Sequence, residues 1–264
     1  MDDKYDRIIL FCDYGVDDAV ATLHILSHAD MFGAIDIVPI GGNVPVQAAY
    51  RNAHTLLAAY GGDLSKVRVV DTRALKQPSA DIPEIHGSDG LGDFLCPSQS
   101  KASVVDFDAF AADIAANAVH ERDCVLSLGP CTIPVMLGYV PFCTVLMGGA
   151  SEERPNYGEY EFNEALDVPA FKRFAGEATA VATLDTCHDP AFGFETMRTG
   201  DELTDKFITR CVELCKARGE EKIAVYDLAA AMAVTHPHLF EVRRLRRSDG
   251  VEYNELKLTE GVER

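Results

Sequence analysis

Short apolar runs alternate with longer segments of helical spacing along most of the chain. Residues 8–12 are too few for a stable helix and rich in branched and aromatic side chains, so we predict a buried strand there. The same pattern predicts further strands at residues 35–40, 67–70, 124–128, 142–147 and 180–184. Apolar positions spaced three and four apart predict helices at residues 19–27, 46–60, 107–120, 130–137, 170–174 and 201–216.

This alternation predicts an α/β fold with a mainly parallel central sheet and helices on both faces. Residues 240–258 alternate apolar and polar side chains around a Ser248-Asp249-Gly250 turn, which predicts a C-terminal β-hairpin. The polar segment 151–164 is interpreted as a solvated loop. No linker or block of charge divides the chain, so residues 1–264 are predicted to form a single domain.

Carboxylates gather where the first strand meets the first helix. Asp13 follows the strand, Tyr14-Gly15 permit a sharp turn, and Asp17-Asp18 open the helix. In one interpretation Asp17 caps the helix, Asp18 lies in its first turn and Asp13 accepts hydrogen bonds from turn amides. In the other, a bound cation relieves the mutual repulsion, and oxygen ligands suit Ca²⁺ or Mg²⁺. The spacing leaves both interpretations open.

Polar residues also mark three other places. Asn43 follows the second predicted strand after two glycines. Residues 84–93 carry three glycines, which predicts a loop with unusual backbone angles near a ligand. Asp227 lies in an apolar, alanine-rich run, where an unpaired buried carboxylate is costly. It therefore needs a cation or hydrogen-bond donors.

Charge and composition exclude some partners. The formal net charge of −18 disfavours nucleic-acid polymers and anionic membranes but leaves small neutral ligands unaffected. The acidic N-terminus lacks the apolar core of a signal peptide, and no apolar run reaches membrane-spanning length, so we expect a soluble, cytoplasmic protein. The eight cysteines lie apart in apolar segments, which predicts buried, reduced thiols, with a soft-metal pair at Cys211 and Cys215 as a minor alternative.

The corner CDYGVDDA resembles the D-x-D-x-G-x-D-D-A signature of the inosine-uridine-preferring nucleoside hydrolases. Further matches follow in the same chain order, so the resemblance extends from about residue 7 to about residue 251. The matching segments are Gly42-Asn43, His86-Gly87, Leu128-Gly129-Pro130, Met147-Gly148-Gly149-Ala150, Glu161-Phe162-Asn163 and Asp227.

The resemblance implies a nucleoside hydrolase-like fold and Ca²⁺-dependent hydrolysis of the N-glycosidic bond of a ribonucleoside to free base and ribose. The implied calcium ligands are Asp13, Asp18, Asp227 and the carbonyl of Leu128. Asp13 is also implied to accept a proton from the attacking water. The residues implied to bind substrate are Asp17, Asn43, Met147, Asn156, Glu161, Asn163 and Asp227. Such a reaction builds positive charge on the ribose, which a ring of carboxylates stabilises.

Some positions depart from the family pattern. Phe11 replaces the first Asp of the signature and Tyr14 the usual Pro, and neither is an implied metal ligand. Tyr226 stands where many relatives have a histidine that protonates the departing base, and its ordinary pKa of about 10 makes it a weak acid near neutrality. His86 is the other implied catalytic donor, with a structural hydrogen bond as its alternative role. Asn156 lies one residue out of register with the family's sugar-binding asparagine.

Two other functions compete with hydrolysis of a nucleoside. A non-catalytic nucleoside or ribose sensor would keep the metal site without activating the leaving group. A Mg²⁺-dependent phosphohydrolase with Asp13 as nucleophile is disfavoured, because the D-x-D-x-T order is missing. A small-molecule nucleoside is the expected partner, and the resemblance implies a homodimer or homotetramer. The sequence leaves the preferred base open.

Overall fold

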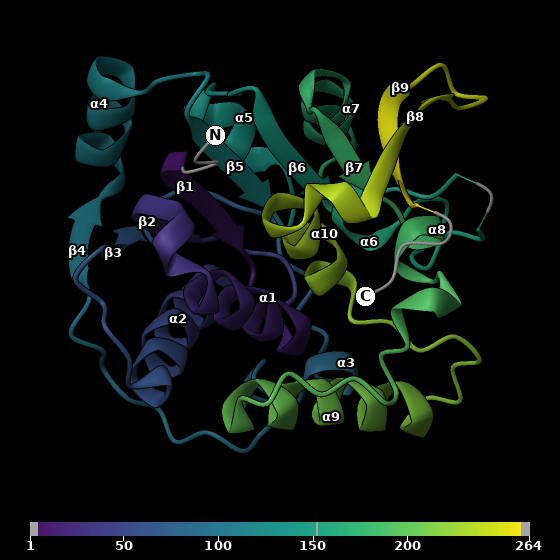
Figure 1. Ribbon diagram of the computed structural model, residues 1–264, viewed down its shortest axis with the longest axis horizontal. Coiled ribbons are helices and arrows are strands. Elements are labelled where there is room, and N and C mark those ends of the chain that lie inside the picture. Colours follow the sequence, from purple (N-terminus) through teal and green to yellow (C-terminus); the bar gives the residue numbers. More distant parts are fainter. Residues whose placement is uncertain (1–4, 152, 260–264) are drawn as a thin grey trace.

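One mixed sheet runs through the molecule, seen here in a computed structural model that describes residues 5–151 and 153–259 (Figure 1). Its strand order is β4-β3-β2-β1-β5-β6-β7-β9-β8. Neighbouring strands are parallel except β8 and β9, which form an antiparallel hairpin. The strands are β1 (Tyr5–Cys12), β2 (Phe32–Pro39), β3 (Val67–Asp71), β4 (Ser103–Asp106), β5 (Asp123–Ser127), β6 (Cys143–Met147), β7 (Ala180–Ala182), β8 (Phe240–Arg246) and β9 (Glu252–Leu258). The predicted parallel sheet and C-terminal hairpin are confirmed.

Helices cover both faces of the sheet, as the alternation of elements predicted. Side chains of β1 alternate between two cores: Ile8 and Leu10 pack with α1, α2, α9 and α10, whereas Ile9 and Phe11 pack with α4, α5 and α7. The helices are α1 (Val16–Ser27), α2 (Val46–Tyr60), α3 (Pro83–His86), α4 (Phe107–Asn117), α5 (Thr132–Leu137), α6 (Phe162–Leu166), α7 (Val168–Glu177), α8 (Leu184–Cys187), α9 (Glu202–Ala217) and α10 (Tyr226–Thr235). Single 3₁₀ turns occur at Ala29–Met31, Pro190–Phe192 and Pro237–Leu239.

Several predictions of local structure were wrong. Strand β4 was missed because its four residues are mostly exposed at the edge of the sheet and carry no long apolar run. The segment 151–164 is not simply a solvated loop, because Glu161 and Asn163 near its end are buried at the start of α6. In the loop 84–93 the first residues belong to the short helix α3, but its three glycines adopt the positive φ angles that were predicted.

The order of the strands positions the site. The chain moves outward from β1 to β2, β3 and β4, and then returns to the other side of β1 at β5. This reversal is a topological switch point, where the loops beyond the carboxyl ends of adjacent strands diverge and leave a crevice. Asp13 follows β1, Asn43 follows β2, Leu128 follows β5, and Met147 ends β6. The polar strand ends seen in the sequence therefore meet at one edge of the sheet.

The composition also led to expectations about membrane-spanning segments and about the cysteines. Within the described residues, no helix combines the length and apolar character needed to cross a bilayer. Residues 1–4 of the N-terminal segment, on which the signal-peptide prediction partly rested, lie outside those residues. All eight cysteines are free, as predicted, and most are buried; Cys96 is exposed. Cys211 and Cys215 are not in any group of described side chains suited to a metal ion.

Candidate active site

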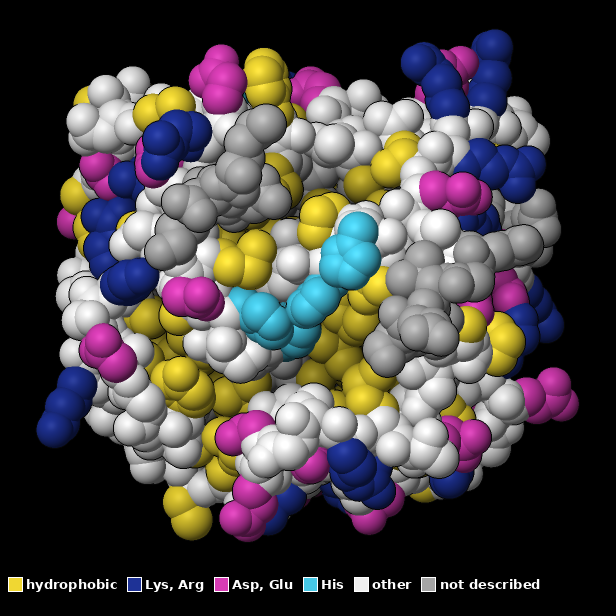
Figure 2. All heavy atoms as spheres, in the orientation of Figure 1, with side chains coloured by type: hydrophobic (Ala, Val, Ile, Leu, Met, Phe, Trp, Pro, Cys, Tyr) yellow, Lys and Arg dark blue, Asp and Glu magenta, His cyan; other side chains and the backbone are white. Residues whose placement is uncertain are grey.

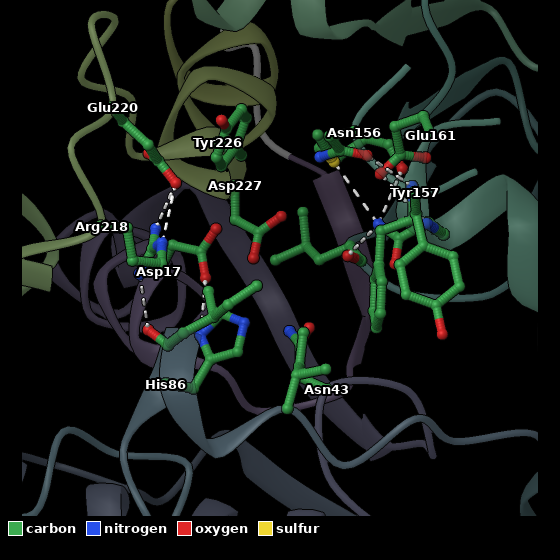
Figure 3. Close-up of a pocket in the computed structure, with 16 residues that line it drawn as sticks. Asp17, Asn43, His86, Asn156, Tyr157, Glu161, Arg218, Glu220, Tyr226 and Asp227 are labelled. Carbon is green, nitrogen blue, oxygen red and sulfur yellow. Dashed lines mark hydrogen bonds and ion pairs between the residues drawn. The ribbon is translucent and has the colours of Figure 1, made fainter. Parts of the chain in front are cut away.

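A pocket with a cavity volume of about 170 Å³ lies at the carboxyl edge of the sheet (Figure 3). The residues named from the sequence that line it are Asp17, Asn43, His86, Leu128, Met147, Asn156, Glu161, Asn163, Tyr226 and Asp227. In Figure 3 the Asp17, Asn43, His86 and Asp227 side chains converge from different segments.

Asp13 and Asp18 lie beneath the pocket floor and are fully buried. Asn43 connects them: its backbone N–H donates to Asp13 Oδ2 over 2.8 Å, and its Nδ2 donates to Asp13 Oδ1 over 2.9 Å and to Asp18 Oδ2 over 3.3 Å. A Cβ on Gly42 would overlap the Asp13 carboxylate, so glycine at this position lets the loop after β2 close over Asp13. The loop thus fixes the orientation of Asp13.

The start of α1 differs from the capping arrangement considered for the sequence. The helix begins at Val16 with Gly15 as its N-cap, so Asp17 is not the cap. Asp18 accepts hydrogen bonds from the backbone N–H groups of Gly15 (2.8 Å) and Asp13 (3.1 Å) and thereby closes the corner. Tyr14, rather than Gly15, adopts the positive φ of the turn, at 49°. Glycine is needed at position 15 for space, because a Cβ there would collide with Asn43 and His86.

The buried carboxylates of the site are poorly compensated. Burial is the largest cause that raises the pKa of Asp17 to about 7 and that of Asp18 to about 6, and it raises the pKa values of Asp13 and Asp227 well above their usual range. Repulsion from neighbouring carboxylates adds to the shifts of Asp13, Asp17 and Asp227. Asp17 Oδ1 is buried and makes no hydrogen bond to the described residues.

This arrangement fits a hard cation. Carboxylate oxygens of Asp17, Asp18 and Asp227 lie within 4.8 Å of one another. A divalent cation would relieve their repulsion and give the orphaned oxygen of Asp17 a counter-charge nearby. Since the donors are all oxygens, they suit Ca²⁺ or Mg²⁺ better than zinc.

The opposite wall is held by hydrogen bonds between side chains and backbone groups. Asn163 Nδ2 donates to the carbonyl of Leu128 over 2.9 Å, which ties α6 to the end of β5. Glu161 caps α6, and its carboxylate accepts hydrogen bonds from the N–H groups of Asn163, Glu164 and Gly149 at 3.0–3.1 Å. Burial nevertheless raises the pKa of Glu161 to about 7. Asn156, which lies one residue out of register with the family's sugar-binding asparagine, lines the pocket. Its Oδ1 accepts a hydrogen bond from the N–H of Phe162 over 3.0 Å.

His86 is neutral and oriented. Its Nδ1 accepts a hydrogen bond from the N–H of Val16 over 3.2 Å, so its proton is on Nε2. Burial lowers the pKa of His86 to about 3, and the positive charge of Arg218 contributes. Nδ1 also lies 3.8 Å from Asp17 Oδ1. His86 therefore has the structural hydrogen bond considered as its alternative role and, in addition, faces the pocket.

Sequence reasoning missed the residues beside Tyr226. Its hydroxyl lies 3.0 Å from Nε2 of His188, which comes from the end of α8. Burial raises the pKa of Tyr226 and lowers that of His188, so both are neutral near pH 7. Arg218 and Glu220 form an ion pair at the same rim of the pocket, with 2.7 Å between Arg218 Nη2 and Glu220 Oε1. His188 lies in a segment without apolar period or motif, so no signal in one sequence pointed to it.

The fold and the pocket define a class of α/β protein with a carboxylate-rich small-molecule site at its topological switch point. The chain belongs to the inosine-uridine preferring nucleoside hydrolase family, whose model matches residues 8–261. The family resemblance drawn from the sequence is therefore confirmed.

Individual relatives are more distant. The non-specific ribonucleoside hydrolase RihC of Salmonella paratyphi B is 32% identical over 173 residues, which cover 62% of this chain and 55% of that protein. RihC of Salmonella agona is 31% identical over the same shares. The match thus spans about half the length of these curated relatives.

Solved structures share the fold over almost the whole chain. An inosine-guanosine nucleoside hydrolase superposes with a TM-score of 0.67 at 18% identity, covering 97% of this chain and 88% of that one. A purine-preferring ribonucleoside hydrolase from Gardnerella vaginalis superposes with a TM-score of 0.68 at 22% identity, covering 96% and 88%. At these identities the likeness establishes the architecture.

Proposed function

We propose that this protein hydrolyses the N-glycosidic bond of a ribonucleoside to a free base and ribose. The observation that carries the proposal is the group of buried carboxylates with raised pKa values at the pocket on the carboxyl edge of the sheet. Membership of the nucleoside hydrolase family and the names of the RihC relatives support the same reaction. A small neutral nucleoside also suits a chain with a net charge of −18.

Calcium is the proposed cofactor. Asp13, Asp18 and Asp227, with the carbonyl of Leu128, are the proposed ligands; Asp227 and Leu128 line the pocket, and Asp13 and Asp18 are fully buried. Calcium, when bound there, would polarise a water and hold the ribose diol. Asp17 is 9% exposed at the pocket wall and has an unpartnered oxygen, so it is proposed to accept hydrogen bonds from the ribose hydroxyls. Asn43, whose Nδ2 donates to Asp13 and Asp18, is proposed to accept a hydrogen bond from a sugar hydroxyl through its Oδ1.

The chain's own groups supply the other steps. Asp13 is held by two hydrogen bonds from Asn43 and has a raised pKa, so it is suited to accept a proton from the attacking water. The nearby carboxylates stabilise the positive charge that develops on the ribose as the bond to the base breaks. Met147, Asn156, Glu161 and Asn163 are proposed to shape the sugar side of the pocket.

The departing base is proposed to receive hydrogen bonds from Tyr226 and His86. The Tyr226 hydroxyl, hydrogen-bonded to His188, and the Nε2–H of His86 are on residues that line the pocket. Because the pKa of Tyr226 is raised, its contribution is donation of a hydrogen bond rather than full transfer of a proton in the resting state. If water can protonate the ring nitrogens of a departing base, hydrolysis of that nucleoside would depend least on Tyr226 and His86.

The decisive experiment is a panel of purine, pyrimidine and modified nucleosides, incubated with the protein in the presence of calcium or of a chelator. Release of reducing sugar that requires calcium supports the proposal. Calorimetric binding of ribose or a nucleoside with no turnover across the panel would instead favour a non-catalytic sensor. The proposed homo-oligomer, a dimer or tetramer, is tested in the same preparation by sedimentation.

Two neighbouring aspartates separate metal binding from sugar binding. Asp18→Asn is expected to weaken calcium binding at least about tenfold, because a proposed ligand loses its charge. Asp17→Asn is expected to leave calcium affinity within a few-fold and to lower kcat/KM at least about tenfold, through lost hydrogen bonds to ribose. Calcium calorimetry and steady-state kinetics on both variants check this division. Equal loss of calcium affinity in both would assign Asp17 to the metal as well.

A further inference from the structure

Three histidines meet on the surface away from the pocket. His24 lies in the last turn of α1, His28 caps the end of that helix, and His236 caps the end of α10. One ring nitrogen from each lies within 4.8 Å of the other two. In Figure 2 histidine side chains form a continuous cyan strip near the centre of the face shown. All three side chains are partly exposed, so an ion from solvent can reach them.

The surrounding hydrogen bonds engage one nitrogen of each ring. Thr235 donates its hydroxyl proton to the carbonyl of Ala231 and can therefore accept from two rings. His24 Nε2 and His236 Nδ1 each lie 2.8 Å from that hydroxyl. His28 Nδ1 lies 2.9 Å from the carbonyl of His24, to which it donates.

When Thr235 accepts from both rings, one lone pair is left on each imidazole. These lone pairs are on His24 Nδ1, His28 Nε2 and His236 Nε2, and none of the three atoms makes a hydrogen bond within the described part of the chain. Ring nitrogens held in this way by a hydroxyl or carbonyl on their other side are typical of metal-ligating imidazoles. Burial and the two neighbouring rings lower the pKa of His24 to about 3, which keeps it neutral.

The electrostatic setting also favours a cation. The two helices end at this point, and a helix C-terminus carries partial negative charge from its free carbonyls. Three neutral imidazoles suit borderline metals such as Zn²⁺ and leave a fourth position for water. The acidic site lies at the opposite, N-terminal ends of the same helices, so the two sites are distinct.

We propose that His24, His28 and His236 form a binding site for a divalent transition metal, with Zn²⁺ as the ion that fits it best. The site joins α1 to α10, which pack against each other and carry Asp17, Asp18 and Asp227 at their other ends. A metal here therefore clamps the two helices that present the acidic site. Its role is structural, since no histidine of the cluster lines the pocket.

The test is calorimetric titration of Zn²⁺ into the full-length protein with calcium already saturating. One Zn²⁺ per chain is expected, and both His28→Gln and His236→Gln are expected to weaken it about 10–100-fold. The matched control, His120→Gln, removes an exposed histidine that contacts the carbonyl of Val140, and should bind as the parent does. Zn²⁺ should also raise the thermal midpoint of the parent but not of the two cluster variants.

Cobalt substitution separates this site from the free thiols. Co²⁺ bound by imidazoles lacks the intense thiolate charge-transfer absorption that ligation by any of the eight cysteines would produce. Absence of that absorption, with loss of binding in both cluster variants, supports the proposal. No saturable binding, unchanged affinity in both variants or a thiolate spectrum would overturn it. None of these readouts depends on nucleoside hydrolysis.

Discussion

Asp13→Asn is expected to lower kcat by about 10²–10⁴-fold, the usual contribution of a general base. The substitution keeps the shape of the side chain but removes the basic oxygen that is proposed to accept a proton from water. Asp13 is completely buried, and its carboxylate receives both hydrogen bonds from Asn43, so its position depends on the loop after β2 rather than on solvent. Steady-state kinetics on the best nucleoside of the panel measure the effect.

The fold should tolerate this change better than the chemistry does. Ionised Asp13 is opposed by burial and by the charge of Asp18, so a neutral amide relieves repulsion in the calcium-free protein. The amide of Asn43 can turn to accept from the new donor, at the expense of its 3.3 Å hydrogen bond to Asp18. We therefore expect the thermal midpoint without calcium to stay the same or rise. Near-normal kcat in Asp13→Asn would contradict the proposed base.

Asp123→Asn is a matched control at the other end of the sheet. Asp123 begins β5 and is also buried, and it accepts hydrogen bonds from Tyr139 Oη (2.9 Å) and from the N–H of Val119 (3.0 Å). Its conversion should leave kcat unchanged and cost roughly 1–3 kcal/mol of folding stability, because a buried acceptor is weakened. Loss of kcat in Asp13→Asn with little loss of stability, and the reverse in Asp123→Asn, would separate a catalytic role from a packing role.

The sequence was sufficient to predict the central part of the molecule. Residues 8–12 are apolar at every position, which is typical of a strand buried on both faces, and β1 is the strand around which the sheet reverses. Polar residues directly after such strands had to meet at one edge. That is why Asp13, Asn43 and Leu128, which each follow a strand, could be predicted to lie at the same edge of the sheet before any coordinates.

Other parts of the site depend on contacts that no local pattern encodes. The interpretation of Asp17 as the cap of α1 was wrong. Tyr14 makes the turn with a positive φ, and Asp17 is therefore free to face the pocket. His188 contacts Tyr226, 38 residues away in the chain, and Thr235 at the end of α10 contacts His24 in α1, 211 residues away. Such pairs are set by how helices pack on the finished sheet. Edge strand β4 was missed for a related reason, since an exposed strand needs no apolar run.

Calcium is expected to stabilise the protein more at pH 8 than at pH 5.5. The folded-state pKa values of Asp17 and Asp18, about 7 and about 6, lie above the ordinary value of 3.8. The folded state therefore binds more protons than the unfolded state, and these groups cost stability progressively as the pH rises from about 4 to above about 7. At pH 8 both carboxylates are ionised and calcium binds them directly, whereas at pH 5.5 both are mainly protonated in the calcium-free folded state, so calcium must displace protons and stabilises less.

The magnitude follows from mass action. At a calcium concentration about 100 times Kd, binding contributes about 2.7 kcal/mol, or roughly 5–10 °C in the thermal midpoint at pH 8. Buried His24 and His86 have the opposite pH dependence, because their lowered pKa values mean that stability is lost as the pH falls below about 6.5. Comparing midpoints with and without calcium at each pH cancels that contribution, which does not involve the proposed calcium ligands.

Asp18→Asn is the variant that isolates the cause. It removes a carboxylate from the centre of the group, so the calcium-dependent shift should shrink at pH 8 and its pH dependence should flatten. Calorimetric scans at the two pH values, with calcium or a chelator, give four midpoints for each protein. A calcium shift as large at pH 5.5 as at pH 8 would mean that the ion binds away from these carboxylates, since protons compete for every oxygen in the group.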